Sequence, residues 1–292
     1  IGAGVPVPSA FYRLSMSEPL EDLLDKLSSI DLVSVFLERL AEDIATPSPD
    51  LESPAIYHAL VGERARGLYT NFGHSLTSPV AFAPLLAVRP LVELAILAKW
   101  ISLDPEFHGF LWFADSEASE LTHLDAMLEH SKTRGSPTPK FDPHDLTPKR
   151  AIRDEALRRL KAARRNYGKN RLTPSVIRMV EEVEKQVPGH KIAMRDDYEY
   201  AYRTFSPWEH STASSFKATA EPIPPDSWGW LGDRSPFHIE DVQAIGASIY
   251  AYILEVVFLG LEHENATLAR TLRDYVTVRW VRSDRVQPTS EE

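Results

Sequence analysis

Apolar residues recur at helical spacing along most of the chain. After Pro174, valine and isoleucine side chains stand at positions 176, 177, 180, 183 and 187, a spacing that places them on one face of a helix. The stretch YVTVRWV (275–281) is also compatible with a short strand. The full pattern predicts helices over roughly 19–45, 54–76, 79–103, 105–131, 147–167, 174–187, 191–217, 238–262 and 264–280.

The 22 prolines agree with a helical chain because many of them stand where helices begin. At seven predicted starts the proline follows a serine, threonine or aspartate, whose side chain can accept a hydrogen bond from a free N–H of the first turn. Proline loses nothing at the first helical position, since its missing N–H would be unpaired there. The predicted starts are Ser53-Pro54, Ser78-Pro79, Asp104-Pro105, Thr147-Pro148, Thr173-Pro174, Ser206-Pro207 and Ser235-Pro236.

These helices predict an all-α fold, a multi-helix bundle that forms a single domain over residues 1–292. We expect its core to cover about residues 19–280 and the tail over 283–292 to be disordered. Segments 133–145 and 220–236 have the composition of loops. The second contains Trp228 and Trp230, which predicts that it folds back over the bundle or closes a cleft.

Composition excludes several classes of function. The chain has no cysteine, which excludes disulfides, thiolate zinc sites and cysteine nucleophiles. Two long apolar stretches carry charges at their centres, Arg89 and Glu93 in one and Glu255 in the other, so we interpret them as core helices rather than membrane spans. We expect a cytoplasmic protein with no membrane contact, no cofactor and no metal.

The net charge of −10 argues against a surface built mainly to bind nucleic acid. Residues 148–171 nevertheless carry ten lysines and arginines against two acidic residues, a local charge of +8. This segment is either a solvated, exposed helix or an RNA-contacting surface on which a tyrosine stacks against a base. The side chains that would contact RNA are Arg158, Arg159, Arg164, Arg165 and Tyr167.

Candidate chemistry is concentrated around YRTFSPWEHS (202–211). On a continuous helix, Tyr198, Tyr202, Ser206 and His210 would form a ladder at four-residue steps, with Arg203 along its edge. Such a ladder would support an imidazole with hydroxyl groups from the same helix. It is interrupted, however, by a proline.

Pro207 has no N–H to donate and its ring crowds the preceding turn, so a helix must kink or break there. If the helix breaks, Ser206 becomes the N-cap of a capping box with Glu209. His210 would then lie in the first turn of a new helix, where the positive end of the dipole favours neutral imidazole. His210 is therefore either a general base or a core histidine bonded to a carbonyl.

The segment resembles the signature of HEPN-domain ribonucleases, in which an arginine is followed by four to six residues and a histidine. Arg203, six intervening residues and His210 fit this motif. The resemblance implies an all-helical homodimer that cleaves RNA without metal in a cleft between two facing motifs. In such enzymes the histidine serves in acid/base chemistry on the ribose 2′-OH and the leaving oxygen, and the arginine stabilises the developing phosphorane charge.

The wider context resembles a bacterial family of unknown function, and through it the HEPN-like superfamily. Its members show an Arg…Glu helix, here RPLVELAILAKWI with Arg89 and Glu93, followed by Tyr, Tyr, Ser and His at four-residue steps. The similarity covers about residues 79–217. Arg89 and Glu93 are either a buried ion pair or, if they face His210, a carboxylate that orients its imidazole.

We therefore predict a HEPN-like, metal-independent endoribonuclease or nucleotide- or RNA-binding protein of a toxin or defence type, acting as a homodimer. His210 and Arg203 would be its catalytic pair. The alternative is a non-catalytic helical module in which Arg89, Glu93, Tyr202 and His210 form a structural polar network and the tryptophan loop binds a ligand or partner.

A more distant alternative is a di-metal carboxylate oxidase. Glu120 and His123 form a single Glu-x-x-His step of the kind found in di-iron bundles. No second copy exists in the sequence, and the only further carboxylates at plausible positions are Glu93, Glu117 and Glu255. Ordinary surface polarity accounts for the step without a metal.

Overall fold

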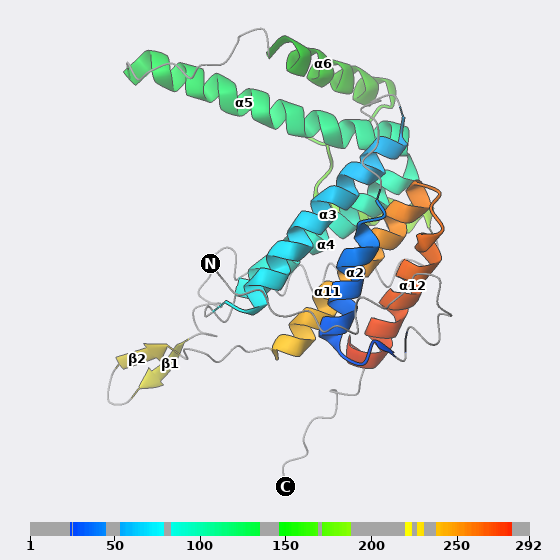
Figure 1. The fold of residues 1–292 in the computed structure, drawn as a ribbon. Coiled ribbons are helices and arrows are strands. Elements are labelled where there is room, and N and C mark those ends of the chain that lie inside the picture. Colours follow the sequence, from blue (N-terminus) through cyan, green and yellow to red (C-terminus); the bar gives the residue numbers. More distant parts are fainter. Residues whose placement is uncertain are drawn as a thin grey trace.

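The computed structural model describes residues 24, 26–44, 53–78, 83–134, 146–168, 171–187, 220–223, 227–230 and 238–281. The predicted all-α bundle is confirmed, because helices make up nearly all the secondary structure of these residues (Figure 1). They are α2 (Ile30–Ala41), α3 (Ala55–Leu76), α4 (Ala83–Leu103), α5 (Phe110–Arg134), α6 (Leu146–Ala162), α7 (Val176–Gln186), α11 (Ile239–Gly260) and α12 (Asn265–Val276), with short π-helical turns η2 (Pro105–Gly109) and η5 (Thr277–Val281).

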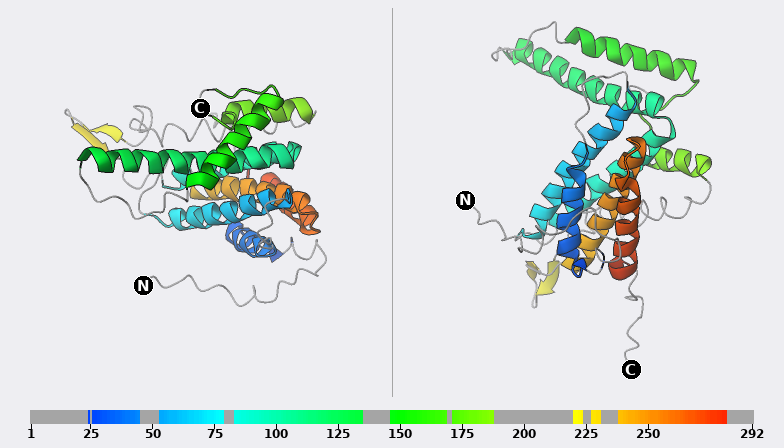
Figure 2. Two further views of the ribbon diagram at one scale, coloured as in Figure 1. Left: turned by 90° about the horizontal axis from the view of Figure 1, so that it is seen from above. Right: turned by 45° about the vertical axis from the view of Figure 1, so that its right-hand side comes forward.

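Five helices, α2, α3, α4, α11 and α12, pack side by side as a bundle (Figure 1). The long helix α5 leaves one end of this bundle and packs against α6, which runs back toward the bundle (Figures 1 and 2). Helix α7 packs on α4. This arrangement leaves the α5–α6 pair projecting and brings α7 close to the junction of α4 and α5.

Helix α11 is the centre of the bundle because it is apolar on almost every face. It contacts α2, α3, α4 and α12, and the large side chains Tyr250 and Phe258 are fully buried. By length and composition alone α11 could cross a membrane, but two thirds of its apolar stretch, 67%, is buried inside the protein, and a core helix passes the same test. Its one buried carboxylate, Glu255, accepts hydrogen bonds from Arg270 and Arg273 of α12.

Glycines allow α3 and α11 to approach closely. A Cβ at Gly246 of α11 would lie 2.4 Å from the ring of Phe72, and one at Gly260 would lie 2.3 Å from the imidazole of His58. On α3, a Cβ at Gly62 would lie 2.8 Å from Ile44 and 3.2 Å from Val257. A methyl group fits none of these spaces without movement, so the glycines set the distance between the two helices.

Some of the helix starts predicted at prolines are capped as expected, and others are not. Asp104 caps as expected, since its carboxylate accepts from the N–H of Phe107 at 3.1 Å and Pro105 is the first residue of η2. Thr173 does not cap, because α7 begins only at Val176 and the Thr173 hydroxyl donates to Asp115 instead. Helix α3 likewise begins at Ala55 without a side-chain cap. The Ser206-Pro207 and Ser235-Pro236 starts lie outside the described residues.

Two expectations about extended structure are corrected. Residues 275–281 are not a strand, since they complete α12 and form η5. Segment 220–236 is not wholly a loop, since strands β1 (Ala220–Ile223) and β2 (Ser227–Trp230) pair antiparallel with Ala220 opposite Trp230. This hairpin lies at the end of the bundle away from α5 and α6 (Figure 1). Helix 191–217 and the 283–292 tail lie outside the described residues.

Helix α11 ends in a Schellman motif that uses glutamate where glycine is usual. The N–H of Glu262 donates to Leu259 O and that of His263 donates to Phe258 O, while Glu262 has a left-handed φ of 53°. The ring of His263 packs on that of Phe258, with centroids 5.1 Å apart, which is the apolar contact typical of the motif. The left-handed conformation costs a residue with a Cβ about 1 kcal/mol.

We expect Glu262→Gly to stabilise the protein by roughly 0.5 to 1 kcal/mol, the left-handed penalty less the extra chain entropy of glycine. Thermal or urea unfolding measures the change. Glu262→Ala is the control, because it removes the same exposed carboxylate and keeps the Cβ. Equal stability of the two variants would contradict the assignment of strain to this residue.

Candidate functional site

The predicted catalytic pair, Arg203 and His210, lies outside the described residues. The same is true of Tyr198, Tyr202 and Ser206, which were expected to support it. Their roles stay predictions. The site residues that the structure does describe are Arg89 and Glu93 and the members of the basic segment.

Arg89 and Glu93 form the ion pair that their spacing on α4 suggests. Arg89 Nε lies 3.2 Å from Glu93 Oε1, and the two side chains are 10% and 40% exposed. The arginine end is therefore buried, while the carboxylate end is open. Glu93 faces a hollow between α4 and the start of α7, so this pair borders a space that could hold a ligand.

The charges of α6 are mostly neutralised by carboxylates. Lys149 Nζ lies 2.6 Å from Glu117 Oε2 and 2.8 Å from Glu120 Oε2, both on α5. Arg158 and Arg159 both pair with Glu155 of their own helix. A helix whose cations are already paired is a poor surface for phosphate, so the geometry favours the interpretation of α6 as a solvated helix that docks on α5.

Ion pairing also accounts for the Glu-x-x-His step on α5. Glu120 is held by Lys149, and His123 is exposed to solvent. Among the described residues, no group of three or more histidine, aspartate or glutamate side chains is arranged to hold a metal ion. The described part of the chain therefore offers no di-metal site.

Arg165 and Tyr167, expected on an RNA surface, belong instead to a polar network that the sequence did not predict. Arg165 NH1 lies 2.9 Å from His108 Nε2, 3.0 Å from Tyr167 Oη and 3.3 Å from Glu182 Oε2. The Glu182 carboxylate also accepts from Trp100 Nε1 at 2.8 Å. Tyr167 is only 9% exposed, so its ring is not available to stack on a base.

His108 is the buried centre of this network. Its Nδ1 lies 2.7 Å from Trp100 O, a carbonyl that can only accept, so Nδ1 carries the proton and Nε2 accepts from Arg165. The imidazole stacks on the Trp100 ring at a centroid distance of 4.0 Å. Burial lowers the pKa of His108, and the nearby Arg165 charge acts in the same direction, against the carbonyl bond from Trp100. The histidine is therefore neutral and structural.

Beyond this network, two adjoining hollows surround the N-terminal end of α7. The larger, of about 620 Å³, lies between α3, α4, α5 and the residues that lead into α7, with Trp112, Leu94 and Leu97 among its apolar lining. The smaller, of about 390 Å³, is mainly polar and is lined by residues of the segment that leads into α7 and by Arg178 of its first turn. Arg171 and Ser175 line both hollows, which makes them one groove.

Positive charge predominates in this groove, although the Asp115 carboxylate that lines it has no cationic partner among the described residues. Glu93 is neutralised by Arg89, and Asp115 accepts hydrogen bonds from Leu172 N and Thr173 Oγ1, both at 3.1 Å. Within the described part of the chain, the guanidinium groups of Arg64 and Arg171 have no hydrogen-bonding or ionic partner. We call Arg64, Arg171 and Arg178 the groove arginines.

The start of α7 adds partial positive charge to the same groove. Ser175 is the N-cap, but its side chain makes no capping hydrogen bond, so the first N–H groups of α7 remain available. Arg178 is held only by a long contact of 3.4 Å to Asn166 O. A helix N-terminus beside guanidinium groups attracts anions.

Sequence reasoning missed His108, Glu182 and the groove arginines. Arg171 was counted in the basic segment, but nothing in the sequence distinguished it from Arg165, because both are arginines near the end of one charged run. His108, next to the Asp104-Pro105 start, carried no recognisable motif. Only the packing of α7 on α4 decides which of these groups are paired.

The fold and site define an all-helical bundle with a cationic groove at the start of one helix. Comparison with known proteins finds no family model, no curated protein and no solved structure that matches this chain.

The lowered pKa of His108 predicts an acid-sensitive fold. Because the folded protein resists protonation that the unfolded chain accepts, the stability from this group is present above about pH 6.5 and is lost as the pH falls. We expect the melting temperature to fall between about pH 7.5 and pH 5.5, and to fall less in His108→Gln, whose amide can replace both hydrogen bonds.

Differential scanning calorimetry at the two pH values measures this effect. His123→Gln is the matched control, since His123 is exposed on α5. It should keep the pH dependence of the unchanged protein. The assignment to His108 would be wrong if the two variants lost the same stability on acidification.

Proposed function

We propose that this protein binds RNA or nucleotides through phosphate contacts in the groove at the start of α7. The observation that carries the proposal is the set of groove arginines, Arg64, Arg171 and Arg178, none of which pairs with a carboxylate in the described part of the chain. Since exposed cations usually lower their energy by pairing with acidic neighbours, as they do along α6, unpaired arginines around one hollow favour an anionic ligand.

The two parts of the groove suit the two parts of a nucleotide. The smaller, polar part contains Arg171, Arg178 and the free N–H groups of α7, which suit a phosphate. The larger part contains Trp112, whose ring can stack on a base. This division supports a nucleotide over a simple inorganic anion, because the apolar part would otherwise remain unused.

For the reaction, we propose the HEPN-like chemistry that the motif of Arg203 and His210 implies. The histidine would take the proton of the ribose 2′-OH, whose oxygen attacks phosphorus. The bond to the 5′ oxygen would break, and that oxygen would receive the proton from the imidazolium. The products would be a 2′,3′-cyclic phosphate and a 5′-hydroxyl end, with no metal required. Arg203 would stabilise the charge on the phosphorane. A homodimer with facing motifs and a toxin or defence role are part of this proposal.

Binding and cleavage can be tested separately. For binding, we expect Arg171→Ala and Arg178→Ala each to weaken the affinity for a fluorescently labelled single-stranded RNA. Each should also reduce the magnitude of the slope of log affinity against log salt concentration by about 0.7, because a variant with one fewer phosphate contact releases fewer counterions on binding. Fluorescence anisotropy over a salt series measures both quantities.

Arg158→Ala is the matched control, because Arg158 is exposed, has the same charge and is paired with Glu155. It should leave the affinity almost unchanged. RNA binding that is equally sensitive to all three substitutions would assign it to general surface charge instead of the groove.

For cleavage, purified protein incubated with RNA in EDTA should produce fragments with cyclic phosphate ends. His210→Ala and Arg203→Ala should abolish them without reducing the affinity measured by anisotropy, since binding is assigned to the groove arginines. Intact RNA at high protein concentration would reject the ribonuclease while leaving the binding proposal to its own test.

The second candidate is a non-catalytic helical module, which the structural polar groups favour. The His108 network holds α4, α7 and the turn after α6 together, and the Arg89–Glu93 pair lies within α4. If RNA is neither bound nor cut, the result favours the non-catalytic module, and the groove would bind another anionic ligand or partner.

A further inference from the structure

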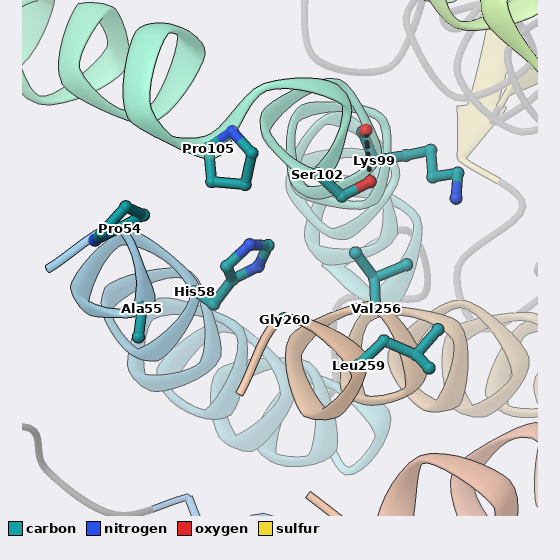
Figure 3. Close-up of a pocket in the computed structure, with 9 residues that line it drawn as sticks. All are labelled: Pro54, Ala55, His58, Lys99, Ser102, Pro105, Val256, Leu259 and Gly260. Atoms are coloured by element: carbon teal, nitrogen blue, oxygen red, sulfur yellow. Dashed lines mark hydrogen bonds between the residues drawn. The ribbon is translucent and has the colours of Figure 1, made fainter. Parts of the chain in front are cut away.

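A second pocket, separate from the α7 groove, lies where α3 begins and where α4 and α11 end (Figure 3). Its volume is about 300 Å³. Most of its wall is apolar, formed by Pro54, Ala55, Pro105, Val256 and Leu259. The polar side chains in it are His58, Lys99 and Ser102. The sequence singled out none of these three polar side chains.

His58 is buried with no bonding partner for its ring. It is only 2% exposed, and within the described residues neither ring nitrogen makes a hydrogen bond. Figure 3 shows the imidazole extending from α3 into the space between Pro105, Ser102 and Gly260. A neutral imidazole has one donor and one acceptor, and the described residues of the protein supply a partner for neither, so both can serve a molecule that enters the pocket. The His58 ring therefore presents a hydrogen-bond donor and an acceptor to the pocket.

The surrounding structure holds the imidazole in this position. A Cβ on Gly260 would lie 2.3 to 2.4 Å from three ring atoms of His58, so the glycine is what makes room for the ring. Burial lowers the pKa of His58, which keeps the ring neutral. His108 is also buried and neutral, yet both of its nitrogens are bonded within the protein. The contrast shows that His58 has the burial of a structural histidine without its hydrogen bonds.

Lys99 brings a positive charge to the edge of the same pocket, on the side away from His58 (Figure 3). Its neighbour Glu255 is already bonded through one oxygen to Arg270 and through the other to Arg273. Burial lowers the pKa of Lys99, Glu255 opposes this shift, and Arg270 adds to it. The Ser102 hydroxyl is occupied, since it donates to Lys99 O at 2.8 Å. The groups left for a ligand are thus the Lys99 ammonium and the His58 ring.

We propose that this pocket binds a small organic acid. Its carboxylate would pair with Lys99, a second polar group would bond to His58, and its few carbon atoms would lie against Pro105, Val256 and Leu259. A nucleotide is excluded by size, because the volume is at the lower limit of pockets that hold small ligands. The site is thus distinct in position and chemistry from the proposed RNA groove.

The probe for the test is 4-hydroxybutyrate, with butyrate and 1,4-butanediol as comparisons that lack the hydroxyl or the charge. Nuclear magnetic resonance of the intact protein follows the imidazole signals of His58 during titration. We expect saturable shifts with 4-hydroxybutyrate, an affinity about tenfold lower for butyrate because one hydrogen bond to a buried group is lost, and no saturation with the diol.

Two variants separate binding from a structural role. His58→Phe keeps a planar ring and removes the ring nitrogens, so we expect a melting temperature at least equal to that of the unchanged protein. Isothermal titration calorimetry should show that this variant binds 4-hydroxybutyrate about tenfold more weakly than the unchanged protein, and no better than butyrate. Lys99→Gln should weaken the two acids about tenfold, since it removes a charge-assisted contact. Lys161→Gln is the control, because Lys161 is exposed on α6, and it should change nothing.

The proposal is overturned if the His58 signals do not shift with either acid, or if they shift equally with the diol. It is also overturned if His58→Phe lowers the melting temperature and binds 4-hydroxybutyrate as tightly as the unchanged protein, since the histidine would then serve only packing. None of these measurements involves RNA or the groove arginines, so failure here leaves the proposed RNA function untouched, and the reverse also holds.

Discussion

The close contact between α3 and α11 is the constraint on which the rest of the bundle depends. Glycines at 62, 246 and 260 let large side chains of one helix enter the surface of the other. Glycine inside a helix is unfavourable by roughly 0.5 to 1 kcal/mol relative to alanine, so these helices are stabilised by the packing that the glycines permit. The same contact buries His58 against Gly260 and so creates the pocket at the end of α11.

A buried polar network provides the second level of organisation. His108, Arg165 and Glu182 come from η2, the turn after α6 and α7, and every one of them is paired within the protein. Polar contacts of this kind are directional, so they fix α7 in one orientation on α4 where apolar packing alone would allow neighbouring ones. The position of the α7 start, and with it the groove, follows from this network.

Pairing distinguishes the structural polar groups of this protein from those that can bind a ligand. Arg165 and Arg171 are six residues apart in one basic run, yet the first is paired in the network and the second faces a hollow without a partner in the described residues. His108 and His58 show the same contrast between two buried histidines. Groups that folding leaves unpaired retain their full interaction energy for another molecule, and this is the physical basis of both proposed sites.

The sequence by itself determined the helices, because the 3.6-residue apolar period and the proline starts are local properties of the chain. Its predicted ranges for α3, α4, α6, α11 and α12 agree with the structure to within a few residues, and the Arg89–Glu93 pair followed from spacing on one helix. Predictions from neighbouring residues were wrong where a side chain distant in the sequence bonded to the residue in question. Thr173 bonds to Asp115 instead of capping α7, and Tyr167 is buried by its contact with Arg165. Only the tertiary structure decided which charges are paired, which histidine is left without a partner and where the hollows lie, since each depends on side chains that are far apart in the sequence.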